Sequence, residues 1–282
     1  MRAVIALIFL CHSWSYSQQD SIKTAPGPWA HTIVTGLTLT QVAFRDWNQG
    51  GENALSYTVG LYGQSMYTEE MMDWSSSYKF AFGQTRLSVQ GLKKTDDKID
   101  LESVVTFKPG TFLNLYGAVT LKSQFATGYR YDEATGGRTP VSKFFDPAYL
   151  TQSTGIGYRP LSEIKTRLGV ALREIVTSVY VQYADDPATS AIEKTSVKGG
   201  FESVTNVEWK LDQNILFTAK LELFAAFDKL NQVIMRSDNS LAAKVNKYIS
   251  VIINVQLINE RNISPRTQVK QTLGLGLSYQ LL

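Results

Sequence analysis

The end of the chain alternates strictly between two kinds of residue. Successive side chains of a β-strand point to opposite faces, so a period of two sorts these residues onto two surfaces. One face is apolar and the other is small or polar: Leu273, Leu275, Leu277, Tyr279 and Leu281 against Thr272, Gly274, Gly276, Ser278 and Gln280. We therefore predict a strand that lies between an apolar surface and a wet one.

The same alternation recurs along most of the chain. Eleven runs show it, at residues 32–44, 53–67, 74–89, 97–107, 111–125, 151–158, 162–173, 198–210, 215–227, 247–257 and 267–281. If these strands close into a bacterial membrane barrel, their number should be even. One strand has then been missed or counted in excess. Residues 177–183 and 232–236 are the candidates for an additional strand. We predict about twelve strands, within a range of 10 to 14.

The first seventeen residues have the pattern of a secretory signal peptide. Arg2 precedes an apolar stretch at residues 3–11, and small residues flank a cleavage point after Ser17. The stretch is too short to cross a membrane as a helix, and Leu10 before Cys11 argues against a lipoprotein. We divide the chain into a signal peptide at 1–17, a short leader at 18–30 and a barrel domain at 31–282.

The rest of the chain contains no cysteine, because Cys11 is the single one. An exported domain without disulfides needs another source of stability, such as a large core, a closed sheet or a bilayer. Tight turn signals, such as Lys108-Pro109-Gly110, alternate with longer polar stretches at 128–148, 184–197 and 229–247. This asymmetry is typical of outer-membrane barrels.

The predicted fold class is therefore an all-β, antiparallel transmembrane β-barrel in the cell outer membrane. A secreted β-sandwich is the alternative, since alternation alone does not distinguish a core from lipid. The barrel is favoured by the uninterrupted series of strands, by the apolar face that continues to the C-terminus, and by aromatic residues near strand ends. Those aromatic residues are Trp47, Trp74, Tyr78, Trp209 and Tyr279.

Several segments, taken in order, carry a family resemblance. They are residues 46–53 (DWNQGGEN), 94–97 (KTDD), 123–125 with 128–129, 144–150 (FFDPAYL) and 273–279 (LGLGLSY). Together they resemble an uncharacterised outer-membrane barrel family of Bacteroidetes-type bacteria that carries a domain-of-unknown-function label. The resemblance implies fold and location but no substrate. It also implies that Gly274, Leu277 and Tyr279 form a signal for the barrel assembly machinery, although this chain ends in Leu282 rather than in an aromatic residue.

Two loop segments are candidate contact or rim sites. The first segment is predicted to be a tight bend. Its paired glycines permit backbone conformations with positive φ, and its asparagine side chains can form hydrogen bonds with the neighbouring backbone. It contains Trp47, Asn48, Gly50, Gly51 and Asn53. The second contains Phe144 and Phe145, which either fold back into the lumen or pack on the surface.

The polar faces of the strands give the best indication of function. The candidate lumen-lining residues are Lys98, Asp100, Glu102, Glu163, Lys165, Arg167, Arg173, Lys198, Glu202, Glu208, Lys220 and Glu222. Their charges are of mixed sign, so they either pair across the lumen or line a narrow polar pore. We predict a porin-like channel or transport-associated barrel for small solutes. The alternative is a non-conducting barrel that binds partner proteins through its long loops.

Other functional classes receive little support. A net charge of +3 without a dense basic run argues against nucleic acid. His31 is the single histidine after the signal peptide, so a Ser–His hydrolase is disfavoured and we expect no enzyme, cofactor or metal. An oxygen-only calcium site at Asp96, Asp97, Asp100 and Glu102 is disfavoured, because alternation places Asp97 on the opposite face from the other three and Lys98 lies among them. The expected partners are membrane lipids and the assembly machinery.

Overall fold

The computed structural model describes residues 28–42, 54–87, 91–109, 113–132, 136–246, 248–261 and 263–280. The predicted signal peptide, most of the leader and the segment from Trp47 to Asn53 lie outside these ranges. No helix among the described residues is both long enough and apolar enough to span a membrane.

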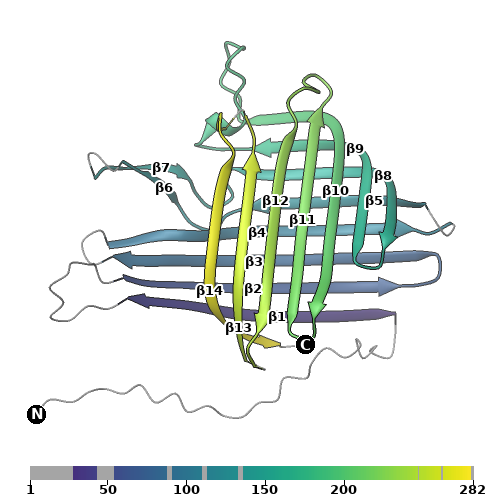
Figure 1. The fold of residues 1–282 in the computed structure, drawn as a ribbon. Helices are drawn as coiled ribbons and strands as arrows, with labels where there is room; N and C mark the ends of the chain where they lie inside the picture. The colour runs from purple at the N-terminus through teal and green to yellow at the C-terminus, as the bar shows by residue number, and fades with distance from the viewer. Residues whose placement is uncertain are drawn as a thin grey trace, which may run out of the picture.

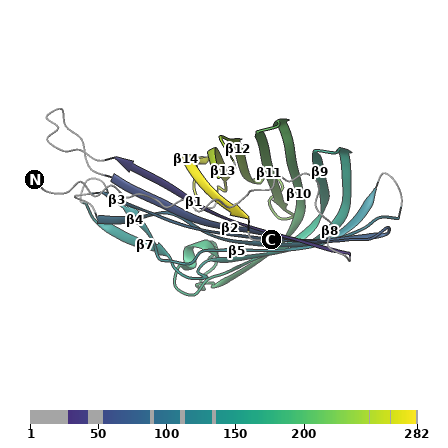
Figure 2. The same ribbon diagram turned by 90° about the horizontal axis from the view of Figure 1, so that it is seen from below.

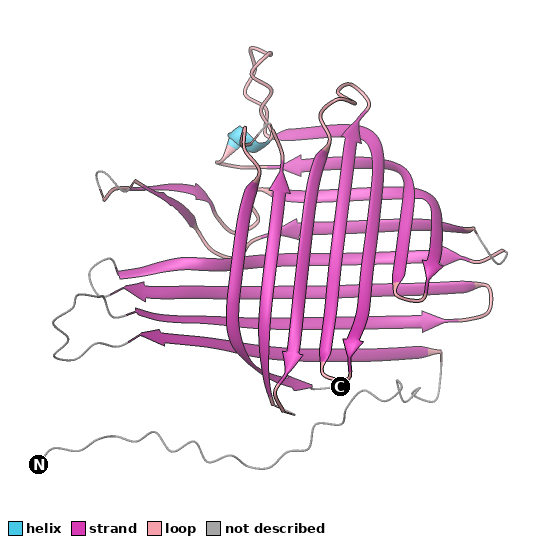
Figure 3. Ribbon diagram, viewed as in Figure 1, coloured by secondary structure: helices cyan, strands magenta, loops and turns pink. Residues whose placement is uncertain are grey.

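Twelve strands form one closed antiparallel barrel (Figures 1 and 3). In spatial order they are β1 (Trp29–Val42), β14 (Gln268–Gln280), β13 (Ile249–Asn259), β12 (Ile234–Lys244), β11 (Ile215–Ala226), β10 (Thr195–Asp212), β9 (Ile164–Val176), β8 (Ala148–Leu161), β5 (Asn114–Ser123), β4 (Gly91–Phe107), β3 (Met72–Leu87) and β2 (Ala54–Thr68). This confirms the predicted fold class and the choice of twelve strands.

The barrel closes because β1 pairs with strands on both sides. Leu37 lies opposite Leu277 of β14 and also opposite Val59 of β2. Closure leaves no unpaired sheet edge, which is the condition for a sheet to exist in hydrocarbon. Figure 1 shows β1–β5 running crosswise to β10–β14, and Figure 2 shows the second group rising over the first.

The connections differ between the two ends of the barrel. At the end that we call the turn end, β8–β9 and β10–β11 are joined by two residues each, at 162–163 and 213–214. At the other end, which we call the loop end, residues 124–147 join β5 to β8 and residues 177–194 join β9 to β10. The first of these loops contains a separate hairpin of β6 (Gly128–Tyr131) and β7 (Arg138–Ser142), and the second contains the 3₁₀ turn η1 (Val181–Tyr183).

The burial pattern is the reverse of that of a soluble domain. Large apolar side chains face outward and are exposed: Leu273 at 66%, Leu168 at 55% and Val59 at 47%. The buried side chains instead include Asp100, Arg167, Arg173 and Glu202. A sandwich would bury its apolar faces against each other. A barrel with lipid outside and a polar interior produces the observed arrangement.

The structure corrects one predicted loop. Residues 229–247 contain β12, so the stretch is not a loop throughout. Ser237 and Asn239 lie on the outward face of β12 between Met235 and Leu241, and they interrupt the apolar alternation that marks the other strands. Of the two candidates for the additional strand, residues 232–236 overlap β12, whereas residues 177–183 contain η1.

Candidate functional site

Ion pairs gather in the centre of the lumen. Glu102 of β4 accepts hydrogen bonds from Arg167 of β9 and, at 2.6 Å, from Lys220 of β11. Lys220 also lies 3.0 Å from Glu222, which accepts a hydrogen bond from Lys122 of β5. These five side chains form what we call the central cluster. It joins four strands from different parts of the wall.

A second cluster lies nearer the loop end. Glu260, which directly follows β13, is 2% exposed and accepts from two guanidinium groups. Its Oε1 lies 2.9 Å from Nη2 of Arg173, and its Oε2 lies 3.0 Å from Nη2 of Arg236. The ring of Tyr149 lies 5.4 Å from the Arg173 guanidinium and 5.0 Å from that of Arg236. We call these four residues the loop-end cluster.

Two further ion pairs cross from β4 to distant strands. Lys98 lies 2.9 Å from Asp238 of β12, a strand six places away from β4 in either direction around the barrel. Asp96 lies 2.8 Å from Lys270 of β14. Because β4 contacts the opposite wall through its side chains, the lumen is much narrower than the ring of strands.

The lumen beside β9–β11 is filled by close packing. An added Cβ on Gly200 would lie 2.8 Å from Cζ of Phe224, so the ring covers this glycine. Phe224 also packs with Ala171 and Ala226 in a small buried cluster, and Val204 nearby is 1% exposed. Close packing therefore blocks a continuous solute path in this half of the lumen.

In the opposite half of the lumen, small, uncharged residues line the middle of the wall. They lie on β1, β2 and β14 at inward positions of the paired register: Gly36, Thr38, Thr58, Gly60, Thr272 and Gly274. An added Cβ on Gly60 would meet one atom within 4 Å, a backbone oxygen at 3.8 Å. Tyr62 also points inward, opposite Lys79 of β3, and is nevertheless 38% exposed. Open space therefore remains beside part of the Tyr62 side chain in the middle of the barrel on this side.

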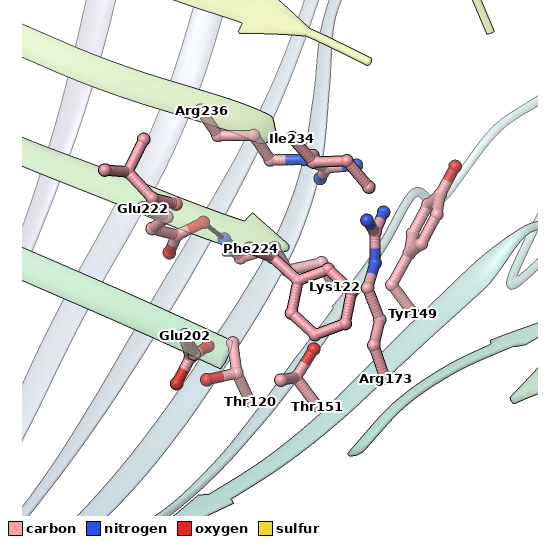
Figure 4. Close-up of a pocket in the computed structure, with 11 residues that line it drawn as sticks. Thr120, Lys122, Tyr149, Thr151, Arg173, Glu202, Glu222, Phe224, Ile234 and Arg236 are labelled. Carbon is pink, nitrogen blue, oxygen red and sulfur yellow. Dashed lines mark hydrogen bonds and ion pairs between the residues drawn. The ribbon is translucent and has the colours of Figure 1, made fainter. Parts of the chain in front are cut away.

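A cavity of about 50 Å³ lies between the two clusters (Figure 4). Its lining includes Lys122, Tyr149, Arg173, Glu202, Phe224 and Arg236. Figure 4 shows the Arg173 and Arg236 side chains approaching each other beside the Tyr149 ring. Oε2 of Glu202 is buried without a hydrogen-bond partner among the described residues.

The predicted lumen residues lie at different heights along the barrel axis. Lys98, Asp100, Glu102, Arg167, Arg173, Glu202, Lys220 and Glu222 lie around the two clusters. Lys165, Lys198 and Glu208 take inward positions toward the strand ends, and Glu163 lies in the β8–β9 turn.

Sequence reasoning missed several members of these clusters. Arg236 lies at the end of the candidate strand 232–236 and Asp238 lies beyond it, in a stretch predicted as a loop. Glu260 lies just beyond its strand. Lys122 and Tyr149 carried a usable signal, since each falls on the polar face of an alternating run or of its extension. Pairing across the lumen depends on closure, which sequence alternation does not specify.

The remaining predicted sites lie away from the lumen clusters. Trp47, Asn48, Gly50, Gly51 and Asn53 fall outside the described residues. Phe144 and Phe145 lie in the β5–β8 loop, 60% and 39% exposed, with ring centroids 4.9 Å apart. Gly274 and Leu277 lie on opposite faces of β14, and Tyr279 pairs with Thr35.

His31 meets a serine on the outer face of the barrel. Its Nδ1 lies 2.9 Å from Oγ of Ser65, and its ring stacks on Trp29 at 5.8 Å. Ser65 pairs with both neighbouring strands, so the backbone N–H groups around it are committed to the sheet and do not form an oxyanion hole. We assign no catalytic role to this pair. Within the described ranges, no group of three or more His, Cys, Asp or Glu side chains is placed to hold a metal ion.

Comparison with known proteins gives one family match. Residues 39–129 match a family described as proteins of unknown function (DUF3078). The match confirms the predicted resemblance to a family with an unknown-function label, over the part of the chain that begins near the end of β1 and ends in β6. No curated protein matches this chain.

Solved outer-membrane proteins are similar to this chain at a low level. The translocator domain of the autotransporter NalP from Neisseria meningitidis is 10% identical, covers 93% of this chain and 91% of its own, and has a TM-score of 0.44. An outer membrane channel from Pseudomonas putida F1 is 11% identical with coverages of 93% and 97% and a TM-score of 0.41. The NanC porin is 8% identical with coverages of 88% and 98% and a TM-score of 0.40. The fold assignment rests on the strand pairing described above rather than on these likenesses.

Proposed function

We propose that this protein is an outer-membrane barrel that forms a narrow channel for small polar solutes. The observation that carries the proposal is the exposure of Tyr62 at an inward, mid-barrel position. The path runs along the wall of small residues on β1, β2 and β14. The central cluster and the β4 ion pairs bound it on the other side.

The outer face supports a position in a bilayer. Trp29, Tyr67 and Trp74 lie together at the turn end, with the Trp29 ring 5.1 Å from Tyr67 and 5.6 Å from Trp74. Nε1 of Trp74 donates to Oγ of Ser103 at 2.8 Å. Aromatic rings with a polar group occur at membrane interfaces of barrels. We place this aromatic group at the periplasmic interface of the outer membrane.

Export and assembly complete this proposal. Residues 1–17 act as a signal peptide, and Gly274, Leu277 and Tyr279 contribute to recognition by the barrel assembly machinery in a Bacteroidetes-type bacterium. Lipids of the outer membrane surround the exposed apolar face. No catalytic activity is part of the proposal.

The lumen charges set the expected selectivity. Cations and carboxylates are mixed in the narrow part of the lumen, so neither a cation nor an anion faces only groups of its own charge. We expect weak charge selectivity and strong size selectivity, because the path is bounded by side chains that are held in place by ion pairs.

One observation favours a second candidate function, a non-conducting barrel that binds a protein partner. The β5–β8 loop presents exposed Phe144 and Phe145 while Asp146 beside them is anchored in the structure. A fixed aromatic pair at the loop end is a suitable contact surface. In this alternative, the ion pairs of the lumen serve only stability.

Planar-bilayer recording of the refolded mature chain tests the proposal. Heat-modifiable gel migration first establishes that the barrel is folded. We expect small, stable unitary steps and a reversal potential close to zero in a salt gradient. A folded barrel that stays silent in the bilayer would contradict the channel and favour the partner-binding alternative.

A further inference from the structure

We infer that the cavity between the two clusters binds a small hydroxycarboxylate. This inference goes beyond the proposed function, because the cavity lies beside Phe224 of β11 and apart from the path along β1, β2 and β14. It stands on three features of the cavity: an excess of cations, an unpartnered carboxylate oxygen and a limited volume.

The cations around the cavity outnumber the carboxylates that pair with them. In the loop-end cluster, Arg173 and Arg236 share the single carboxylate of Glu260. In the central cluster, three cations share the two carboxylates of Glu102 and Glu222. Asp100 and Glu202 are two further buried carboxylates beside the central cluster, so the excess cation belongs to the loop-end cluster. The side of the cavity formed by Arg173 and Arg236 is therefore an environment for one negative charge.

The guanidinium groups supply a suitable receptor for a carboxylate. Each uses one Nη2 atom on Glu260, and a guanidinium has five N–H donors in a planar fork. Tyr149 lies against both groups and Phe224 lies 5.8 Å from that of Arg173, so their planes are held by ring contacts. Planar, preorganised forks favour carboxylate over a spherical anion.

Glu202 indicates which functional group the ligand carries besides its carboxylate. Its side chain lines the cavity, is 9% exposed, and leaves Oε2 without a partner among the described residues. A buried carboxylate oxygen requires a hydrogen-bond donor. A ligand hydroxyl supplies that donor, whereas a second ligand carboxylate would be repelled.

The volume limits the size of the ligand. One water-sized group occupies about 10–15 Å³ on this measure, so a cavity of about 50 Å³ accepts about three to five such groups. Glycolate, with a carboxylate and one hydroxymethyl group, has five non-hydrogen atoms and meets this limit. Acetate is its matched analogue without the hydroxyl.

Saturation-transfer NMR on the refolded, detergent-solubilised barrel tests the inference with glycolate and acetate as probes. We expect saturable transfer to glycolate, with several-fold weaker binding of acetate. Arg236→Lys keeps an ion pair with Glu260, and hence the fold, but removes the planar fork, so glycolate binding should fall several-fold. Arg266→Met, in the exposed β13–β14 loop, is the control and should bind glycolate as the unmodified chain does.

Glu202→Gln tests recognition of the ligand hydroxyl separately from recognition of the ligand carboxylate. Loss of one negative charge should strengthen acetate binding, while the weaker acceptor should reduce the preference for glycolate over acetate. Equal binding of glycolate and acetate to the unmodified barrel, or transfer that does not saturate, would overturn the inference. The binding measurement needs no conduction: a silent barrel that binds glycolate refutes the channel alone, and a conducting barrel without saturable binding refutes this site alone.

Discussion

Lys220 and Glu102 meet across the lumen, with 2.6 Å between Nζ and Oε2, although they belong to strands five places apart around the barrel. The same carboxylate accepts a hydrogen bond from Arg167. Glu102 therefore neutralises two cations whose side chains are only 10–12% exposed. Its removal leaves charges that few water molecules can reach.

We expect Glu102→Gln to lower the free energy of unfolding by roughly 3 kcal/mol, because breaking a buried ion pair leaves an uncompensated charge. Urea titration of the barrel in lipid vesicles, followed by tryptophan fluorescence, measures the change. Glu208→Gln is the control, since Glu208 is an exposed inward carboxylate of β10, and its effect should stay within about 0.5 kcal/mol. Equal effects of the two substitutions would contradict the structural role of the central cluster.

Gly200 is required by the ring of Phe224. A Cβ there would lie 2.4 Å from the carbonyl oxygen of Ala225 and 2.8 Å from Cζ of Phe224, and the backbone oxygen has little freedom to move. We expect Gly200→Ala to destabilise the barrel by about 1–3 kcal/mol through overpacking. Gly157→Ala, whose Cβ would meet its nearest atoms at 3.9 Å, should change stability by less than about 0.5 kcal/mol. The same vesicle titration compares the pair, and a neutral Gly200→Ala would show that the ring does not need the glycine.

Asp146 gives the β9–β10 loop a dependence on pH. Its carboxylate, 2% exposed, accepts from the Val179 N–H at 2.8 Å and from Oγ of Ser178 at 2.9 Å. Burial acts to raise the pKa of Asp146, but these hydrogen bonds outweigh it and hold the pKa below its ordinary value. The stabilisation is therefore complete above the unfolded pKa of about 4 and is lost as pH falls through the lower folded value.

Hydrogen exchange at the Val179 amide measures this contribution. We expect its protection to be constant near neutral pH and to fall under acid conditions below about pH 4. Asp146→Asn should lower the protection at neutral pH and remove most of the acid dependence. Asp228→Asn, in an exposed part of the β11–β12 loop, should behave like the unmodified chain. An unchanged acid profile in Asp146→Asn would assign the effect to another group.

The sequence predicts the barrel well where alternation is strong and poorly where polar residues break it. β14 alternates leucine with small residues, and its predicted span of 267–281 differs from the observed Gln268–Gln280 by one residue at each end. Only residues 232–236 of the β12 region were predicted as a candidate strand, because outward Ser237 and Asn239 interrupt the apolar face of β12. Nδ2 of Asn239 donates to Oγ of Ser237 and to the backbone oxygen of Val255 on β13, so this donor is bonded within the wall.

The candidate site was predictable only as a set of faces. Alternation places Glu102, Arg167 and Lys220 on polar faces, but their meeting depends on the order and stagger of strands separated by up to 118 residues. Local pattern carries no information on which strands oppose each other. The exposed path beside Tyr62 is even harder to predict from sequence, because it depends on how small residues are distributed around the closed barrel wall.

The most direct test of the channel compares two glycine-to-phenylalanine substitutions. Gly60→Phe introduces a ring into the small-residue side of the lumen, whereas Gly117→Phe introduces the same ring on the outward face of β5, where a Cβ would meet no atom within 4 Å. Unitary conductance in planar bilayers is recorded for both variants after folding is verified by heat-modifiable migration. We expect Gly60→Phe to abolish or strongly reduce the conductance and Gly117→Phe to leave it unchanged. Equal conductance in the two variants would contradict a solute path along β1, β2 and β14.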